Sequence, residues 1–252
     1  MSSLAIASTM FGCVLASSLT AMWLARRLPE AHLVGESRDV VKLGLGVIGT
    51  LTALVLGLLV SATKGTYDTQ SGMVKQLAAE LGMLDRLLAR YGPDANDARA
   101  RIRPLIQAVQ DQFWPSDGAA VDFRGGPSQS AGEAVFEAVA KLDPQTDAQR
   151  LLKARAQDTL VELGRVRQRL AVNSERSIPL PLLAVLGFWQ AVLFAGFGLL
   201  APRNATALTV LIVCMASVSG ALFLVMELDR PFEGLVRVSD TPLHSVMSHL
   251  GE

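Results

Sequence analysis

The chain has 252 residues and a mass of 26.9 kDa, and 23 Lys and Arg residues balance 23 Asp and Glu residues. Zero net charge excludes a nucleic-acid-binding protein that works by bulk electrostatic attraction. Half of the residues are apolar, only 18% are charged and the mean hydropathy is +0.36, whereas about a quarter of the residues in a soluble domain are charged. The excess apolar surface has to face lipid, which predicts an all-α integral membrane protein.

Four stretches are long and apolar enough to cross a bilayer, which takes about 20 residues of helix. These predicted spans are residues 4–24, 43–63, 178–201 and 205–226. Arg26, Arg27, Lys42 and Lys64 flank the first two spans and can reach the headgroups. The sequence therefore divides into membrane parts 1–63 and 178–226, a helical extramembrane domain 64–177 and a C-terminal tail 227–252.

The orientation follows from the Lys and Arg residues near the span ends, because basic residues concentrate on the cytoplasmic side. The face with the two short loops has five of them: Arg26, Arg27, Arg38, Lys42 and Arg203. The face with both termini and the ends of the central region has eight: Lys64, Lys75, Arg165, Arg167, Arg169, Arg176, Arg230 and Arg237. The tally favours cytoplasmic termini and a cytoplasmic central region, although the dense first loop argues the other way.

Two apolar seams of heptad type predict that the central region is a coiled-coil-like stalk. The first seam is Val74, Leu77, Leu81, Leu84, Leu88 and Tyr91. The second is Leu152, Ala156, Thr159, Leu163, Val166 and Leu170. We expect these two helices to pair, and to run on into the second and third spans as long helices.

Shorter helices are expected over Asp97–Trp114 and Glu133–Leu142, packed on this helical hairpin. Between them, Pro115–Gly132 is rich in Gly and Pro and is predicted to be a mobile loop.

The sequence contains no motif that indicates catalysis or a cofactor. Phosphate-binding glycine loops, paired metal ligands and nucleophile motifs are all absent. Cys13 and Cys214 lie inside apolar runs and are interpreted as small apolar residues, while His32, His244 and His249 are interpreted as solvated. We therefore expect neither an enzyme nor a bound cofactor or metal.

The second span carries small residues four positions apart, at Gly49, Ala53, Gly57 and Ser61. Such a stripe favours close helix packing, and in an oligomer it is also compatible with a narrow pore whose constrictions are formed by Leu, Val and Ile. Gln190 is a strongly polar side chain in the middle of a span, so it is either bonded to a neighbouring helix or functional.

Two polar clusters flank the spans. Glu36, Arg38, Asp39 and Lys42 precede the second span, and Glu227, Asp229, Arg230 and Pro231 follow the fourth. The predicted topology places the clusters on opposite membrane faces, so they do not form one site, and a structural role is favoured for both.

Four segments together resemble a bacterial family of membrane proteins known as bestrophin-like. They are Glu36-Ser-Arg-Asp-Val-Val-Lys-Leu-Gly44, Thr50-Leu-Thr-Ala-Leu-Val-Leu-Gly57, Ala201-Pro-Arg-Asn-Ala-Thr206 and Glu227-Leu-Asp-Arg-Pro-Phe232. The resemblance implies four spans, cytosolic termini, a cytosolic helical part and a pentameric anion channel with its pore along the second span. The chain departs from bestrophins in lacking an acidic run after the fourth span, where they hold calcium, and an aromatic-rich neck in the second span. We therefore infer neither calcium gating nor chloride selectivity from the resemblance.

Two functional hypotheses follow. The first is a homo-oligomeric channel for small anions such as chloride. The second is a non-conducting scaffold or sensor whose stalk binds a protein partner. A coupled transporter is less favoured, because coupling usually requires carboxylates inside the membrane and no span has one.

Overall fold

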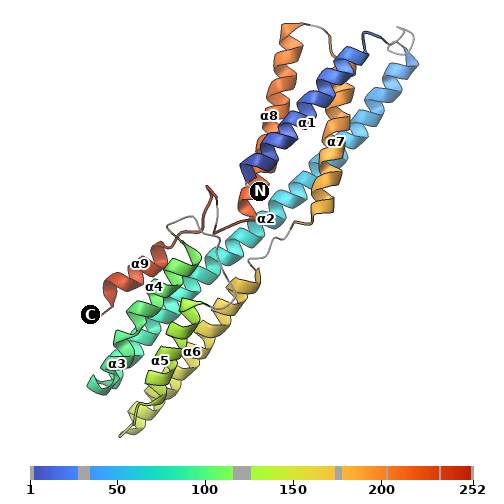
Figure 1. Cartoon of the computed structure of the whole chain (residues 1–252). Coiled ribbons are helices and arrows are strands. Elements are labelled where there is room, and N and C mark those ends of the chain that lie inside the picture. Colours follow the sequence, from blue (N-terminus) through green and yellow to red (C-terminus); the bar gives the residue numbers. More distant parts are fainter. Residues whose placement is uncertain are drawn as a thin grey trace. The chain divides into compact units, whose positions relative to one another are not determined.

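The computed structural model describes residues 3–27, 35–115, 126–173, 178–202, 204–232 and 234–250. These residues are almost entirely helical (Figure 1). They fall into two compact units. Unit 1 comprises Met1–Gly65 and Arg176–Asp229, and unit 2 comprises Thr66–Glu175 and Arg230–Glu252. Helix α2 (Glu36–Tyr91) contributes residues to both units.

Among the described residues, four helices are long and apolar enough to cross a membrane, and their apolar parts belong to unit 1. They are α1 (Ser3–Leu24), the first part of α2, α7 (Leu180–Leu200) and α8 (Ala205–Leu228). Helix α1 lies beside both α7 and α8 (Figure 1). The prediction of an all-α protein with four spans is thereby confirmed.

Small residues bring α1 and α7 close together, as is usual where helices pack in lipid. The Ser17 hydroxyl donates a hydrogen bond to the Ala191 carbonyl, with 3.1 Å between the oxygens. About two turns further along α7, Gly198 faces the backbone of Ser18, and a Cβ at Gly198 would lie 2.5 Å from the Ser18 carbonyl oxygen. The backbone spacing of this helix pair therefore requires glycine at position 198.

Gly198→Ala is expected to destabilise unit 1 by about 1–3 kcal/mol, because the added methyl group can be accommodated only by moving the α1 backbone. Gly220→Ala is the matched control, since a Cβ at Gly220 on α8 meets nothing within 4 Å. The measurement is the thermal unfolding midpoint of the detergent-purified protein. Equal midpoints for the two alanine variants would contradict the assignment of close packing at Gly198.

Unit 2 is built around the two predicted seams. All six residues of the first seam are buried on α2, and the second seam lies along α6 (Asp147–Asn173), where Ala156, Leu163, Val166 and Leu170 are buried in the same core. Helices α3 (Asn96–Ala100), α4 (Ile102–Phe113) and α5 (Pro127–Ala140) complete the bundle. Ile102, Ile106 and Phe113 of α4 are also buried in this core. The first seam and these four positions of the second are confirmed as core positions, whereas Leu152 at the start of the second seam is only partly buried.

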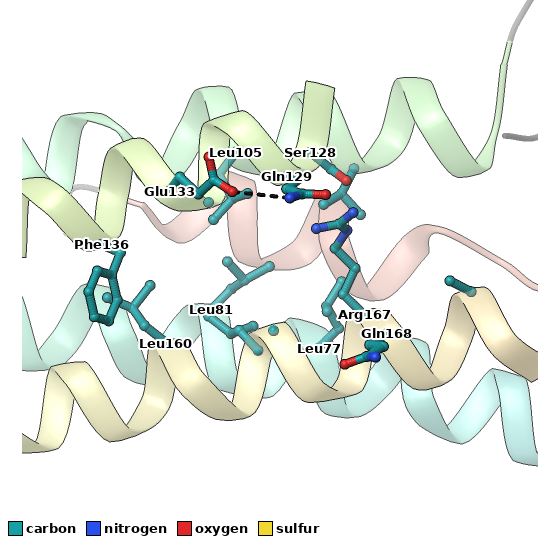
Figure 2. A pocket seen from close by; sticks show the side chains of 15 residues that line it. Leu77, Leu81, Leu105, Ser128, Gln129, Glu133, Phe136, Leu160, Arg167 and Gln168 are labelled. Atoms are coloured by element: carbon teal, nitrogen blue, oxygen red, sulfur yellow. Dashed lines mark hydrogen bonds between the residues drawn. The ribbon is translucent and has the colours of Figure 1, made fainter. Parts of the chain in front are cut away.

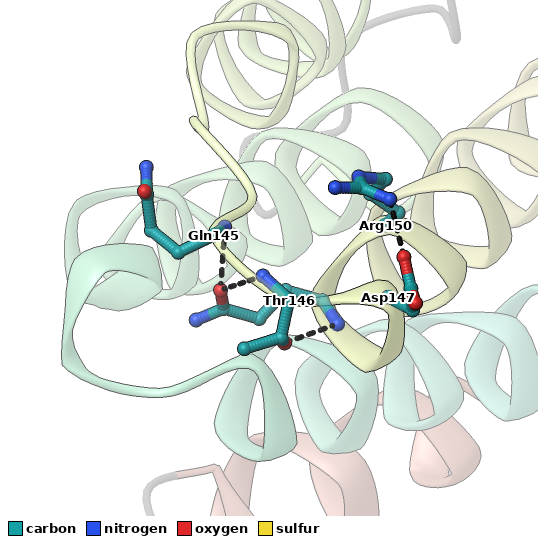
Figure 3. Close-up of polar contacts among 5 residues, drawn as sticks. Gln145, Thr146, Asp147 and Arg150 are labelled. Atoms are coloured by element: carbon teal, nitrogen blue, oxygen red, sulfur yellow. Dashed lines mark hydrogen bonds and ion pairs between the residues drawn. The ribbon is translucent and has the colours of Figure 1, made fainter.

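The start of α6 is fixed by a capping box (Figure 3). The Thr146 hydroxyl accepts from the Gln149 backbone N–H at 3.1 Å, and the Gln149 side-chain oxygen accepts from the Thr146 N–H at 3.3 Å. This reciprocal pair satisfies backbone donors that a helix start leaves free. The Gln149 amide also donates to the Tyr91 carbonyl at 3.2 Å, so the cap connects the beginning of α6 to the end of α2.

Two sequence expectations about helix boundaries are wrong. Helix α5 begins at Pro127, so the segment Pro127–Gly132 is helical rather than part of a loop; residues 116–125 of the expected loop lie outside the described residues. Proline is favoured at the first position of a helix, which explains this start. The helix before the third span also does not continue into it, because Pro179 is extended (φ −65°, ψ 132°) and α7 begins only at Leu180.

Residues 230–252 belong to unit 2, whereas the sequence had set 227–252 apart as a tail. Phe232, Val238 and Leu243 are buried in the unit 2 core, the last of these on α9 (Thr241–His249). Phe232 packs against the rings of Phe113 and Trp114, with centroids 5.5 and 5.4 Å away. The Trp114 indole N–H donates to the Val238 carbonyl at 2.8 Å. Aromatic packing thus holds the C-terminal segment on α4.

Candidate functional site

Within unit 1, helix α2 has one buried face. Leu45, Thr52 and Leu59 are buried and lie seven residues apart, a spacing that keeps side chains nearly in line along a helix. The Leu45 side chain fills the space over Gly196 of α7, where a Cβ would lie 2.3 Å from Leu45 Cδ2. Leu59 joins Leu186 of α7 and two residues of α8 in an apolar cluster. This face of α2 is therefore covered by the other helices of its own unit.

The opposite side of α2 is exposed in the unit. Val40, Val47 and Leu54 are also spaced by seven, and their side chains are 68%, 61% and 59% exposed. Ser61 continues this row and is exposed too. We call Val40, Val47, Leu54 and Ser61 the outer row. A row of this kind has to face lipid or another protein molecule.

The predicted stripe of small residues winds from the buried side of α2 toward the outer row. Each step of four residues advances about 40° around a helix of 3.6 residues per turn. Gly49 accordingly lies against α7, and a Cβ there would be 3.7 Å from a Leu193 methyl carbon. Ala53, Gly57 and Ser61 are exposed, and a Cβ at Gly57 meets nothing within 4 Å. The structure thus brings Gly57 and Ser61, but not Gly49, to the exposed side.

Gln190 lies away from that exposed side. It is only 3% exposed and lines a small space together with Met10 and Val14 of α1 and Ser219 of α8. Its amide is therefore placed at the contact of α1, α7 and α8.

The two polar clusters differ in burial. Glu36, Arg38, Asp39 and Lys42 are all exposed, and the Lys42 ammonium donates to Asp39 at 3.2 Å. In unit 1, Glu227 and Asp229 are only 4% and 6% exposed. Arg230 and Pro231 are the first residues of the C-terminal part of unit 2.

The hairpin between the third and fourth spans has a structural role on its α8 side. The Asn204 side-chain oxygen accepts a hydrogen bond from the Ala207 N–H at 2.8 Å and so caps α8. Arg203 lies outside the described residues.

The described residues contain no group of three or more His, Cys, Asp or Glu side chains that could hold a metal ion. Cys13 and Cys214 are exposed free thiols on membrane helices.

The feature that the sequence interpretation missed is the outer row. The spacing of seven between its residues is visible in the sequence. The prediction instead followed the small residues spaced by four, which lie on a different line along the same helix.

The fold and these surfaces define an all-α integral membrane protein with four spans and a helical extramembrane unit. The chain belongs to the Bestrophin-like family, because the family model of the Bestrophin-like domain matches residues 12–243. The resemblance noted in the sequence is thereby confirmed. A comparison with curated proteins finds no match.

Solved structures share the fold over nearly the whole chain. Two crystal structures of single-residue variants of a bacterial Bestrophin homolog from Klebsiella pneumoniae superimpose with TM-scores of 0.72 and 0.70, at 14% and 15% sequence identity. The first similarity covers 97% of each chain, and the second covers 99% of this chain and 96% of the other. A variant of a protein described only as a membrane protein gives a TM-score of 0.66 at 15% identity, over 97% of both chains. At this level of identity the likeness establishes the fold.

Proposed function

We propose that the chain forms a homo-oligomeric channel in the bacterial inner membrane that conducts small anions such as chloride. The pore is lined by the exposed side of α2. The observation that carries this proposal is the outer row, which leaves Val47, Leu54 and Ser61 uncovered in unit 1 while the opposite side of α2 is packed against α7 and α8.

One span per subunit cannot enclose a pore, so conduction along α2 requires a closed ring of copies. The family suggests five. In such a ring the outer rows of all copies face the axis, where Val47 and Leu54 form apolar constrictions and Ser61 supplies hydroxyl groups. Apolar constrictions of this type can gate ions by excluding water.

Residues 43–63 carry no charged side chain, so no Asp or Glu ring of the kind common in cation channels opposes anions there. Anion conduction itself is proposed from the family resemblance. The excess of Lys and Arg around the termini and the central region favours a cytoplasmic unit 2.

The decisive experiment begins with the subunit number of the detergent-purified protein, measured by native mass spectrometry and followed by particle imaging. A ring with an axial lumen is expected, and chloride efflux from liposomes should then exceed that from empty vesicles. A monomer, or a ring that gives no flux of any ion under the gating conditions tried, would overturn the proposal. The non-conducting scaffold would then be the better hypothesis.

A further inference from the structure

A cavity of about 540 Å³ opens into the helical bundle of unit 2 (Figure 2). Its wall is contributed by α2, α4, α5 and α6 and is mostly apolar. The main apolar side chains are Leu77, Leu81, Leu105, Val109, Leu160 and Leu163. Cavities that bind small molecules have this size and this kind of lining, with a few polar groups that fix the orientation of the ligand.

The principal polar group of the cavity is the guanidinium of Arg167 on α6. Its Nε atom is buried and has no hydrogen-bond partner among the described residues. Burial lowers the pKa of Arg167, and the nearby Glu133 carboxylate raises it, though by less. An N–H group that has lost water without gaining a hydrogen bond is costly, and an anionic group beside it would offset that cost.

Glu133 and Gln129 of α5 occupy the rim across from Arg167 (Figure 2). The Gln129 amide donates to Glu133 at 3.1 Å, which engages one oxygen of that carboxylate. Glu133 remains a negative charge at the rim and disfavours a ligand with several negative charges. Beside one guanidinium and one carboxylate, a ligand with one negative charge that pairs with Arg167 meets less repulsion than a ligand with several.

Two glycines keep the cavity open. Gly164 and Gly132 both line it, and a Cβ at Gly164 meets nothing within 4 Å, while one at Gly132 would touch a Leu105 methyl carbon at 3.9 Å. Gly164 lies three residues before Arg167, so both are on the same side of α6. Glycine inside a helix is less stable than alanine, and at position 164 it leaves the wall of the cavity without a side chain.

We propose that this cavity binds an amphipathic monocarboxylate, a small molecule with an apolar body and one carboxylate. The carboxylate pairs with Arg167, and the apolar body lies along the leucines contributed by α2, α4 and α6. The proposal does not depend on ion conduction, because binding can be measured without any flux assay.

The test uses full-length protein in detergent and a decanoate derivative with a photoreactive diazirine at the end of its chain. Labelled peptides are mapped by mass spectrometry. We expect labelling around residues 77–81 and 160–168, competition by excess decanoate and little competition by decylamine, whose ammonium repels Arg167. Arg167→Gln should weaken labelling about tenfold, since hydrogen bonds to charged groups are among the strong ones in proteins. Gly164→Leu should fill the cavity and remove the labelling.

Arg169→Gln is the matched control, because Arg169 is an exposed arginine of the same helix that does not line the cavity. It should label like the unmodified protein. If Gly164→Leu does not fold, as judged by its thermal unfolding, the comparison of Arg167→Gln with Arg169→Gln tests the proposal by itself. Labelling confined to the membrane helices, or equal labelling of Arg167→Gln and Arg169→Gln, would overturn the proposal.

Discussion

Gly57→Leu is expected to abolish ion flux while leaving the oligomer intact. A Cβ at Gly57 meets nothing within 4 Å in the subunit, so the larger side chain fits without disturbing α7 or α8. In a ring each copy adds one leucine to the exposed side of α2, and these side chains narrow the lumen together. Chloride efflux from liposomes with equal protein content should fall at least about tenfold, toward the level of empty vesicles.

The controls for this prediction are leucine substitutions at Gly12 on α1 and Gly220 on α8. A Cβ at either glycine also meets nothing within 4 Å, so both variants add the same side chain to a membrane helix without a clash inside the subunit. They should conduct normally. If Gly57→Leu assembles and conducts like these controls, and Ser61→Leu does so as well, the pore does not lie along this side of α2.

Gly57 is a better probe than Gly49, although both belong to the same stripe in the sequence. Leucine at Gly49 would press on Leu193 of α7, whose methyl carbon would be 3.7 Å from a Cβ there. A loss of flux in that variant could then result from altered packing within the subunit. A loss of flux can be attributed to a blocked pore only when the substituted position is open in the subunit, because the fold is then undisturbed.

The sequence was sufficient for those parts of the fold that depend on periodicity and length. Helices such as α7 are apolar over a full bilayer thickness, and the heptad seams of α2 and α6 are buried because a seam of this spacing stays on one side of a helix. Boundaries set by single residues were harder to predict. The start of α5 at Pro127 depends on one proline between glycine-rich and helical sequence.

Contacts between distant segments could not be predicted. Phe232 and Trp114 are far apart in the sequence and follow no common period, so nothing in the pattern of either segment indicates that their rings pack together. The cavity beside Arg167 is a similar case. Its lining comes from four helices, and the burial of one guanidinium nitrogen depends on how all four pack.

The spacing of the outer row is visible in the sequence, but whether these residues are exposed depends on how the helices pack. Leu45 and Leu54 are equally apolar in sequence, and both lie in the same predicted span. Leu45 is covered by α7, whereas Leu54 is 59% exposed. Which side of a membrane helix remains open is decided by its neighbours.

Asp85→Ala is expected to destabilise unit 2 by about 2–3 kcal/mol, because it removes the partner of a largely buried arginine. Asp85 on α2 accepts two hydrogen bonds from Arg99 on α3, with N–O distances of 2.6 and 3.0 Å. The side chains are only 9% and 23% exposed. Without Asp85 the guanidinium keeps its charge and loses both bonds, so the cost is mainly that of a partly buried cation left without its partner.

Asp97→Ala is the matched control for this ion pair, since Asp97 also binds an arginine, Arg101, at 3.1 Å, but the two side chains are 71% and 47% exposed. Exposed pairs contribute about 0–1 kcal/mol, so the thermal unfolding midpoint of the detergent-purified protein should hardly change. Replacing Asp85 and Arg99 together by Ala and Met should cost less than the sum of the single substitutions, because the unpaired charge is gone. Equal effects of Asp85→Ala and Asp97→Ala would show that burial does not set the strength of the pair between α2 and α3.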